Sequence, residues 1–145
     1  MARSLTAAGV YFAIIFALGF ALGAIRVPLL APQVGDVAAT LIELPIMLAA
    51  SWLACGWLMR RLKIRSLGHA VIMGAGAFAS LMGAEAVMAA FLFGRSLADH
   101  LASYATPAGA IGLAGQAIFG ALPMVRQAAS RGRTATPDDT ARHTD

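Results

Sequence analysis

Residues 37–59 read VAATLIELPIMLAASWLACGWLM, an apolar run whose only charged side chain is Glu43. A helix of about 20 mostly apolar residues crosses the hydrocarbon core of a bilayer, which is roughly 30 Å thick. The basic run RRLKIR follows at residues 60–65. The stretch therefore predicts a membrane-spanning helix that ends in a strongly basic loop.

The rest of the 145-residue chain has the same apolar character. Apolar residues make up 59% of it and charged residues 12%, against roughly 45–50% and 25% in soluble domains. Too few polar side chains are present to cover a soluble surface, and a disordered chain would need lower hydrophobicity and higher net charge. The single cysteine, Cys55, excludes a disulfide framework and a Cys-based metal cluster.

Three further stretches qualify as spans, at about 6–25, 68–93 and 105–125. Strands of a membrane barrel would alternate polar and apolar residues over about ten positions, and these stretches do not. We therefore expect an all-α fold, a four-helix transmembrane bundle formed by residues 1–126. A cleaved signal peptide is the alternative reading of the first stretch, and the length of its apolar run favours a retained span.

Two segments outside the spans are expected to lack helix. Residues 26–36 contain Pro28, Pro32 and Gly35 and predict a short external loop, because proline removes a donor and disfavours helix before it. Residues 127–145 are polar, carry both charge signs and show no apolar period. They predict a disordered tail.

The basic residues indicate the orientation of the chain. Two of the eleven, Arg26 and Arg95, fall at one face of the predicted bundle. The other nine fall at the opposite face, which the positive-inside rule assigns to the cytoplasm together with both termini. We expect the lipid bilayer to be the partner of this charge, and not nucleic acid, because aromatic and basic residues are not interleaved. The nine are Arg3, Arg60, Arg61, Lys63, Arg65, Arg126, Arg131, Arg133 and Arg142.

Two carboxylates inside the spans, Glu43 and Glu85, are the most informative residues. An ionisable group in a span costs roughly 2.5–3.5 kcal/mol on insertion scales and marks function by default. At about 1.5 Å rise per residue, both lie roughly 7 Å outward of the middle of their spans, which run in opposite directions. They are therefore expected at one level of the bilayer, near Arg26 at the outer end of the first span.

Three arrangements of these residues stay open: an Arg–Glu ion pair, a Glu–Glu pair that shares a proton, and structural hydrogen bonds alone. Gln116, near the middle of the fourth span, is expected to make an interhelical hydrogen bond. Pro45, two residues after Glu43, removes the hydrogen bond to the Leu41 carbonyl and is expected to kink the helix. Together Glu43, Glu85, Arg26 and Gln116 form the predicted polar cluster.

Small residues recur every three or four positions in three spans. Such rows let helix backbones approach closely in a bilayer. Internal packing of one bundle is the favoured reading, and a homo-oligomer interface is the alternative. The rows are Gly19 and Gly23, then Ala75, Ala79 and Gly83, then Ala108, Gly112 and Gly115.

Catalytic signatures are missing from the sequence. The histidines His69 and His100 fall at opposite faces of the predicted bundle, and HExxH, CxxC, GxSxG and P-loop motifs are not found. We therefore expect neither an enzyme nor a bound metal or cofactor. Tyr104 and Trp57 fit interfacial anchors of the spans.

The segments GFALGAIRV (19–27) and ELPIMLAASW (43–52), with Ala84-Glu85 and Gly115-Gln116, carry a resemblance to known sequences. The chain resembles a group of small four-span bacterial inner-membrane proteins without an assigned activity. The likeness covers the four spans and not the tail. It implies a multi-pass protein of the bacterial inner membrane and supplies no activity.

Two functional hypotheses remain. The first is a proton- or cation-coupled transport or channel unit that uses the buried carboxylates, with Arg26 as counter-charge. The second is a non-catalytic structural or accessory protein that binds a membrane-protein partner or lipid, in which the same polar residues only lock the bundle.

Overall fold

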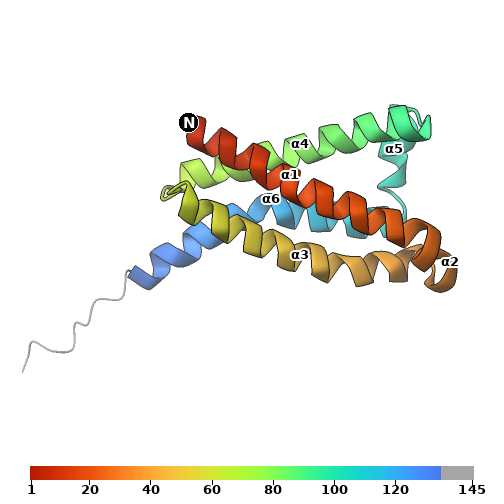
Figure 1. Ribbon diagram of the computed structural model, residues 1–145, viewed down its shortest axis with the longest axis horizontal. Helices are drawn as coiled ribbons and strands as arrows, with labels where there is room; N and C mark the ends of the chain where they lie inside the picture. Colours follow the sequence, from red (N-terminus) through yellow and green to blue (C-terminus); the bar gives the residue numbers. More distant parts are fainter. Residues whose placement is uncertain (135–145) are drawn as a thin grey trace, which may run out of the picture.

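The computed structural model describes residues 1–134 and confirms the all-α fold (Figure 1). Four long helices form the bundle, and each is long and apolar enough to cross a membrane. At 24 to 28 residues and about 1.5 Å per residue, they reach roughly 36–42 Å. The chain is therefore a multi-pass membrane protein. The four are α1 (Ala2–Ile25), α3 (Asp36–Arg61), α4 (Leu67–Phe93) and α6 (Pro107–Thr134).

The four helices form a ring in the order α1, α3, α6, α4. Helix α1 packs against α3 and α4, and α6 packs against the same two helices. Consecutive helices α3 and α4 are therefore not ring neighbours. The N-terminus, the α3–α4 turn and the last turns of α6 lie at one end of the bundle, and α2 and α5 lie at the other (Figure 1).

The core lies inside this ring, and the apolar outer face is open. Tyr11 and Met73 are fully buried, and Phe119 is almost so. By contrast, Phe91 is 83% exposed and Leu53 is 71% exposed. Large apolar side chains that point outward are what a lipid-facing surface requires.

Residues 26–34 correct one prediction, because the expected loop is wound as helix. The π turn η1 (Arg26–Leu30) and helix α2 (Ala31–Val34) continue α1 directly. Pro28 lies in the wider π turn, where the Ala31 N–H donates to the Arg26 carbonyl, and Pro32 lies in the first turn of α2, where an N–H is not needed. The chain reverses only at Gly35, whose φ of 84° suits a residue without Cβ.

The start of the predicted tail is also wrong, because α6 continues through residues 127–134. Gln127 is buried, and its Nε2 donates to the Arg65 carbonyl at 2.7 Å. This contact ties the extra helical turns to the α3–α4 turn, which local composition could not reveal. The remainder of the predicted tail, residues 135–145, lies outside the described residues.

Prolines inside α3 and α6 remove backbone donors from both helices. Pro45 lies within the continuous α3, and the kink expected there stays a prediction. Pro123 lies within α6 and frees the carbonyl of Phe119. The Tyr11 hydroxyl donates to that carbonyl at 3.2 Å, and the Tyr11 and Phe119 rings stack with centroids 4.4 Å apart. The hydrogen bond lost to Pro123 is thus replaced from α1, across the ring.

The backbones of α4 and α6 approach closely at Gly74 and Gly120. A Cβ on Gly74 would collide with the Gly120 carbonyl oxygen, so only glycine fits there. The rows expected to pack internally behave differently. Ala75, Ala79 and Gly83 are exposed on the outside of α4. Their internal-packing role is therefore not observed. The buried face of α4 is formed by other residues, namely Ala70, Met73, Gly74, Ala77, Leu81 and Ala89.

The other predicted rows give a mixed result. A Cβ on Gly19 would press on Met47 at 3.1 Å, and one on Gly115 would overlap the Leu44 side chain, so both glycines face α3 inside the bundle. Gly23 and Gly112 have open space around them. Close packing inside the bundle thus uses one glycine from each of these two rows.

Candidate functional site

A cavity of about 950 Å³ opens between the spans toward the α2 and α5 end of the bundle. Its walls are largely apolar and aromatic, with Phe16, Phe20 and Met88 among them. We call it the polar cavity, after six lining residues that are joined by an ion pair and hydrogen bonds. They are Arg26, Glu43, Glu85, His100, Tyr104 and Gln116.

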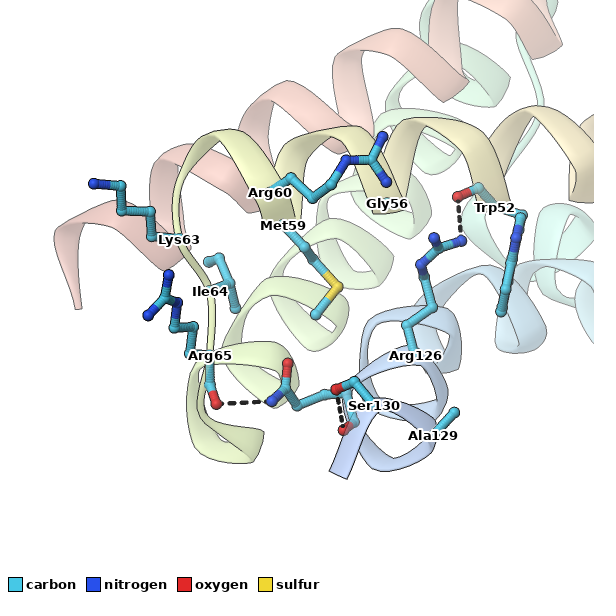
Figure 2. A pocket seen from close by; sticks show the side chains of 11 residues that line it. Trp52, Gly56, Met59, Arg60, Lys63, Ile64, Arg65, Arg126, Ala129 and Ser130 are labelled. Atoms are coloured by element: carbon cyan, nitrogen blue, oxygen red, sulfur yellow. Dashed lines mark hydrogen bonds between the residues drawn. The ribbon is translucent and has the colours of Figure 1, made fainter. Parts of the chain in front are cut away.

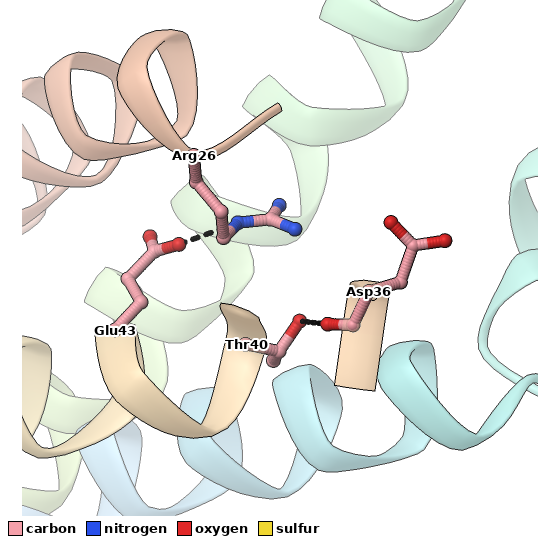
Figure 3. A network of polar contacts seen from close by, with 4 residues as sticks. All are labelled: Arg26, Asp36, Thr40 and Glu43. Atoms are coloured by element: carbon pink, nitrogen blue, oxygen red, sulfur yellow. Dashed lines mark hydrogen bonds and ion pairs between the residues drawn. The ribbon is translucent and has the colours of Figure 1, made fainter. Parts of the chain in front are cut away.

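One wall of the polar cavity holds an ion pair between α3 and η1 (Figure 3). The Nε of Arg26 lies 2.6 Å from Oε2 of Glu43, and the two side chains are 27% and 19% exposed. The π turn that begins at Arg26 sets this side chain directly across from α3. Of the three arrangements considered for Glu43, the structure has the Arg–Glu pair.

Near this pair, α3 begins with a local hydrogen bond. The Thr40 hydroxyl donates to the Asp36 carbonyl at 2.8 Å, one turn before Glu43 (Figure 3). Asp36 sits in the first turn of α3, where a negative charge interacts favourably with the helix dipole. These interactions stabilise the first turns of α3, from which Glu43 extends toward Arg26.

The opposite wall holds Glu85 of α4, which accepts two hydrogen bonds from neutral groups. Gln116 Nε2 of α6 lies 2.5 Å from Oε1, and the Tyr104 hydroxyl lies 3.0 Å from Oε2. Within residues 1–134 no Lys or Arg side chain pairs with this carboxylate. Glu85 is therefore held in place without being neutralised.

The hydrogen bonds continue from Glu85 to α5 (Leu97–Ser103). The Tyr104 hydroxyl oxygen lies 3.1 Å from His100 Nε2, with the two rings edge to face. Because the hydroxyl proton is directed at Glu85, the imidazole must donate its Nε2–H to Tyr104. The result is a chain of donors that runs from His100 through Tyr104 to Glu85.

Helix α5 is short, and its N-terminus is fixed by a capping box. The Ser96 hydroxyl accepts from the Asp99 N–H at 3.1 Å, and the Asp99 carboxylate accepts from the Ser96 N–H at 3.3 Å. These hydrogen bonds from Ser96 hold the pKa of Asp99 below its ordinary value. The cap gives seven residues enough order to present His100 and Tyr104 to the cavity.

Tyr104, which was expected to serve as an interfacial anchor, also takes part in the polar cavity. It lies outside the four spans, yet burial and then the neighbouring Glu85 carboxylate raise its pKa well above the ordinary value near 10. The phenol therefore stays protonated and able to donate. His100 and Tyr104 were missed as site residues because only the fold of α5 brings them back over α4. Their four-residue spacing on a helical turn was the one signal in the sequence.

The two carboxylates do not pair with each other. Glu43 contacts Arg26, whereas Glu85 contacts Gln116 and Tyr104. Each carboxylate pairs instead with elements that contact its own helix, since α3 contacts η1, and α4 contacts α6 and α5. Both carboxylates nevertheless line one cavity.

Gln116 has unused capacity for hydrogen bonding. Its amide nitrogen donates to Glu85, while its Oε1 is buried and accepts no hydrogen bond within the described residues. A buried acceptor without a partner is costly.

Comparison with protein-family models, curated proteins and solved structures found no match. The class of this protein therefore follows from its fold, an all-α four-helix bundle that spans the membrane. Its function must be inferred from the polar cavity alone.

Proposed function

We propose that this protein is a membrane transport unit in which Glu85 exchanges a proton or a small cation. The observation that carries the proposal is the asymmetry of the two carboxylates. Glu43 is neutralised by Arg26, while Glu85 is held only by the neutral Gln116 and Tyr104. A carboxylate that is held by neutral donors in a cavity with largely apolar walls attracts a cation.

The size and lining of the polar cavity support the same function. A volume of about 950 Å³ falls within the range of small-molecule sites, roughly 300–1,000 Å³. The Glu85 carboxylate, which accepts hydrogen bonds from neutral groups only, favours a cation that carries hydrogen-bond donors, such as a protonated amine or a hydrated ion. Aromatic walls would add cation–π attraction.

The donor chain supplies a route for protons. A proton taken up at His100 would pass from its Nε2 to the Tyr104 oxygen, while the Tyr104 proton moves to Glu85. Each step breaks one N–H or O–H bond as the next forms, so Tyr104 ends as a neutral phenol. Glu85 becomes a neutral acid, which would release a bound cation into the cavity.

Flux measurements in proteoliposomes test this function. With a pH-sensitive dye inside the vesicles, Glu85→Gln should lower proton-coupled flux on the order of 10²-fold, a typical contribution of a positioned proton carrier. Glu85→Asp keeps the charge and should retain part of the flux. Equal flux in the wild type and Glu85→Gln would contradict the proposal, as would wild-type vesicles without flux above empty ones.

The second candidate is an accessory membrane protein. It is favoured by one specific observation, since Arg26–Glu43 joins η1, at the end of α1, to α3, and Glu85–Gln116 joins α4 to α6. Such contacts would also lock a bundle that only binds lipid, a second copy or another membrane protein. If no condition supports flux and Glu85→Gln only lowers thermal stability in detergent, this candidate is the better account.

We further propose the bacterial inner membrane as the location, with both termini in the cytoplasm. The support is the nine-to-two division of basic residues and the resemblance to four-span inner-membrane proteins. An impermeant maleimide tests the orientation in a Cys55→Ala background. Gln33→Cys should react in intact cells and Lys63→Cys only after permeabilisation, and the reverse pattern would overturn the orientation.

A further inference from the structure

A second pocket, of about 430 Å³, lies at the opposite end of the bundle, between α3, α6 and the α3–α4 turn. Four cationic residues line it, from the end of α3, the turn and α6. We call it the basic pocket. Its cations are Arg60, Lys63, Arg65 and Arg126. In Figure 2 the Lys63 and Arg65 side chains extend from the turn on the side away from Arg126.

Arg126 is held in this pocket, and no acid of the part of the chain that the structure describes pairs with it. Its Nη1 donates to the Trp52 carbonyl at 3.0 Å, and its guanidinium carbon lies 4.0 Å from the centre of the Trp52 ring (Figure 2). Gly56 leaves the space for this side chain, since a Cβ there would collide with the guanidinium. The carbonyl and the ring orient the charge but do not cancel it.

The turn that carries Lys63 has an unusual backbone. Lys63 has a φ of 53°, in the left-handed region that normally holds glycine. It follows the end of α3 in a Schellman motif. The Ile64 N–H donates to the Met59 carbonyl at 3.0 Å, and the Lys63 N–H donates to the Arg60 carbonyl at 3.4 Å. A lysine at this position loses backbone stability and places a positive charge beside the pocket.

Among residues 1–134 no acidic side chain pairs with these cations. The four acidic residues among residues 1–134 are Asp36, Glu43, Glu85 and Asp99. All four lie in α3, α4 or α5 toward the other end of the bundle. Four cations around one pocket repel one another, so the pocket favours an anionic ligand.

We propose that the basic pocket binds the phosphate of an anionic phospholipid headgroup. A phosphate oxygen accepts charge-assisted hydrogen bonds from a guanidinium group, which Arg126 presents at the pocket, and the exposed Arg60 and Arg65 add positive charge around it. The pocket lies where the spans end, and Trp52, which is 42% exposed, contacts Arg126 at its wall. Basic pockets at the ends of spans bind such headgroups.

This inference does not rest on transport by the polar cavity. It also differs from the assignment of the membrane orientation, because the positive-inside rule requires positive charge in the loop but no pocket. The difference lies in Arg126, whose position depends on Gly56 and Trp52 rather than on charge alone. A test must therefore separate the shape of the pocket from the number of charges.

Native mass spectrometry of the full-length protein measures the binding directly, with phosphatidylglycerol against phosphatidylcholine as probe lipids. The paired change Arg60→Gln with Arg65→Gln should weaken phosphatidylglycerol binding by roughly 25-fold, at about fivefold per cation. The matched control, Arg3→Gln with Arg61→Gln, removes the same charge outside the pocket lining and should change binding less than about twofold.

Two further variants separate weaker lipid binding from a loss of folding. Gly56→Ala keeps every charge and displaces only the flexible end of Arg126, and it should weaken binding by about tenfold. Lys63→Gly relieves the left-handed backbone and should raise thermal stability while it weakens binding about fivefold. Weaker binding in a more stable protein cannot come from misfolding.

Two results would overturn the proposal. Equal weakening by the pocket pair and the control pair, with Gly56→Ala unchanged, would mean diffuse attraction of lipid to the basic end. Inorganic phosphate that displaces phosphatidylglycerol at equal concentration would mean a site for free phosphate rather than lipid. Selective loss in the pocket variants, with phosphate a weak competitor, supports a phospholipid site.

Discussion

Gly74 shows how a single position limits the packing of two spans. Its missing Cβ lets the Gly120 carbonyl of α6 approach α4, and no side chain fits in that space. We expect Gly74→Ala to destabilise the bundle by roughly 1–3 kcal/mol, the usual cost of overpacking. Thermal unfolding in mild detergent measures this loss.

Gly83→Ala is the matched control on the same helix. It is exposed, and a Cβ there would meet nothing within 4 Å. Helix propensity alone should then leave the stability unchanged or raise it by about 0.5–1 kcal/mol. If both variants lose stability equally, close packing at Gly74 is not what stabilises the bundle.

Arg26 and Glu43 allow a second test at the level of single residues. Arg26→Gln leaves a carboxylate in the cavity wall without its partner. The cost should be about 2 kcal/mol, below the roughly 3–5 kcal/mol of fully buried pairs because both side chains are partly exposed. Adding Glu43→Gln removes the stranded charge and should recover most of the loss.

A double-mutant cycle of thermal stability in detergent measures this coupling between the two residues. Additive losses would show that the ion pair contributes nothing. Glu85→Gln serves as the comparison, since Glu85 has no part in the pair. Its loss should simply add to that of Arg26→Gln.

At the scale of elements, α5 is the part of the site that depends most on one local motif. Ser96→Ala removes the capping box, which should cost about 1 kcal/mol and speed amide exchange in α5 about fivefold. Ser80→Ala, an exposed serine of α4, is the control. Hydrogen exchange followed by mass spectrometry reads both, and unchanged protection of α5 would count against the role of the cap.

The same cap predicts a dependence on pH. The pKa of Asp99 is lowered in the folded chain by the Ser96 hydrogen bonds. Its contribution is therefore present above the ordinary Asp pKa of about 3.9 and is lost as the pH falls through the lowered value. Exchange in α5 should speed up over that acidic window in the wild type and change little in Ser96→Ala.

The elements also show what the sequence could predict. The spans follow from composition, because an apolar run such as 37–59 has only one stable arrangement in a bilayer. The proximity of Glu43 and Arg26 was also predictable, because the position of a residue along its span determines its depth in the bilayer. The helical course of residues 26–34 was missed, since prolines there read as breaks although a π turn can hold Pro28.

Tertiary contacts account for the remaining differences between sequence and structure. The ring order that separates Glu43 from Glu85 depends on which helix faces meet, and apolar spans carry little information about that. Tyr104 and His100 reach Glu85 only because α5 folds back across the end of α4. The last turns of α6 are tied down by Gln127 and Arg65, 62 residues apart in the chain.

At the scale of the whole molecule, the two ends of the bundle differ in charge and chemistry. One end holds the polar cavity with its carboxylates and the capped α5. The other holds the basic pocket, with four cations and no acid among the described residues. A phospholipid bound at the basic end would fix the depth of the bundle and so place Glu85 at a constant level in the bilayer.

The account as a whole depends on Glu85 being the carboxylate that exchanges protons while Glu43 stays tied to Arg26. Infrared difference spectra of the reconstituted protein, recorded between acidic and neutral buffer, follow the carbonyl stretch of a protonated carboxyl group. We predict that this band disappears in Glu85→Gln and persists in Glu43→Gln. A band that persists in Glu85→Gln and disappears in Glu43→Gln would contradict the account.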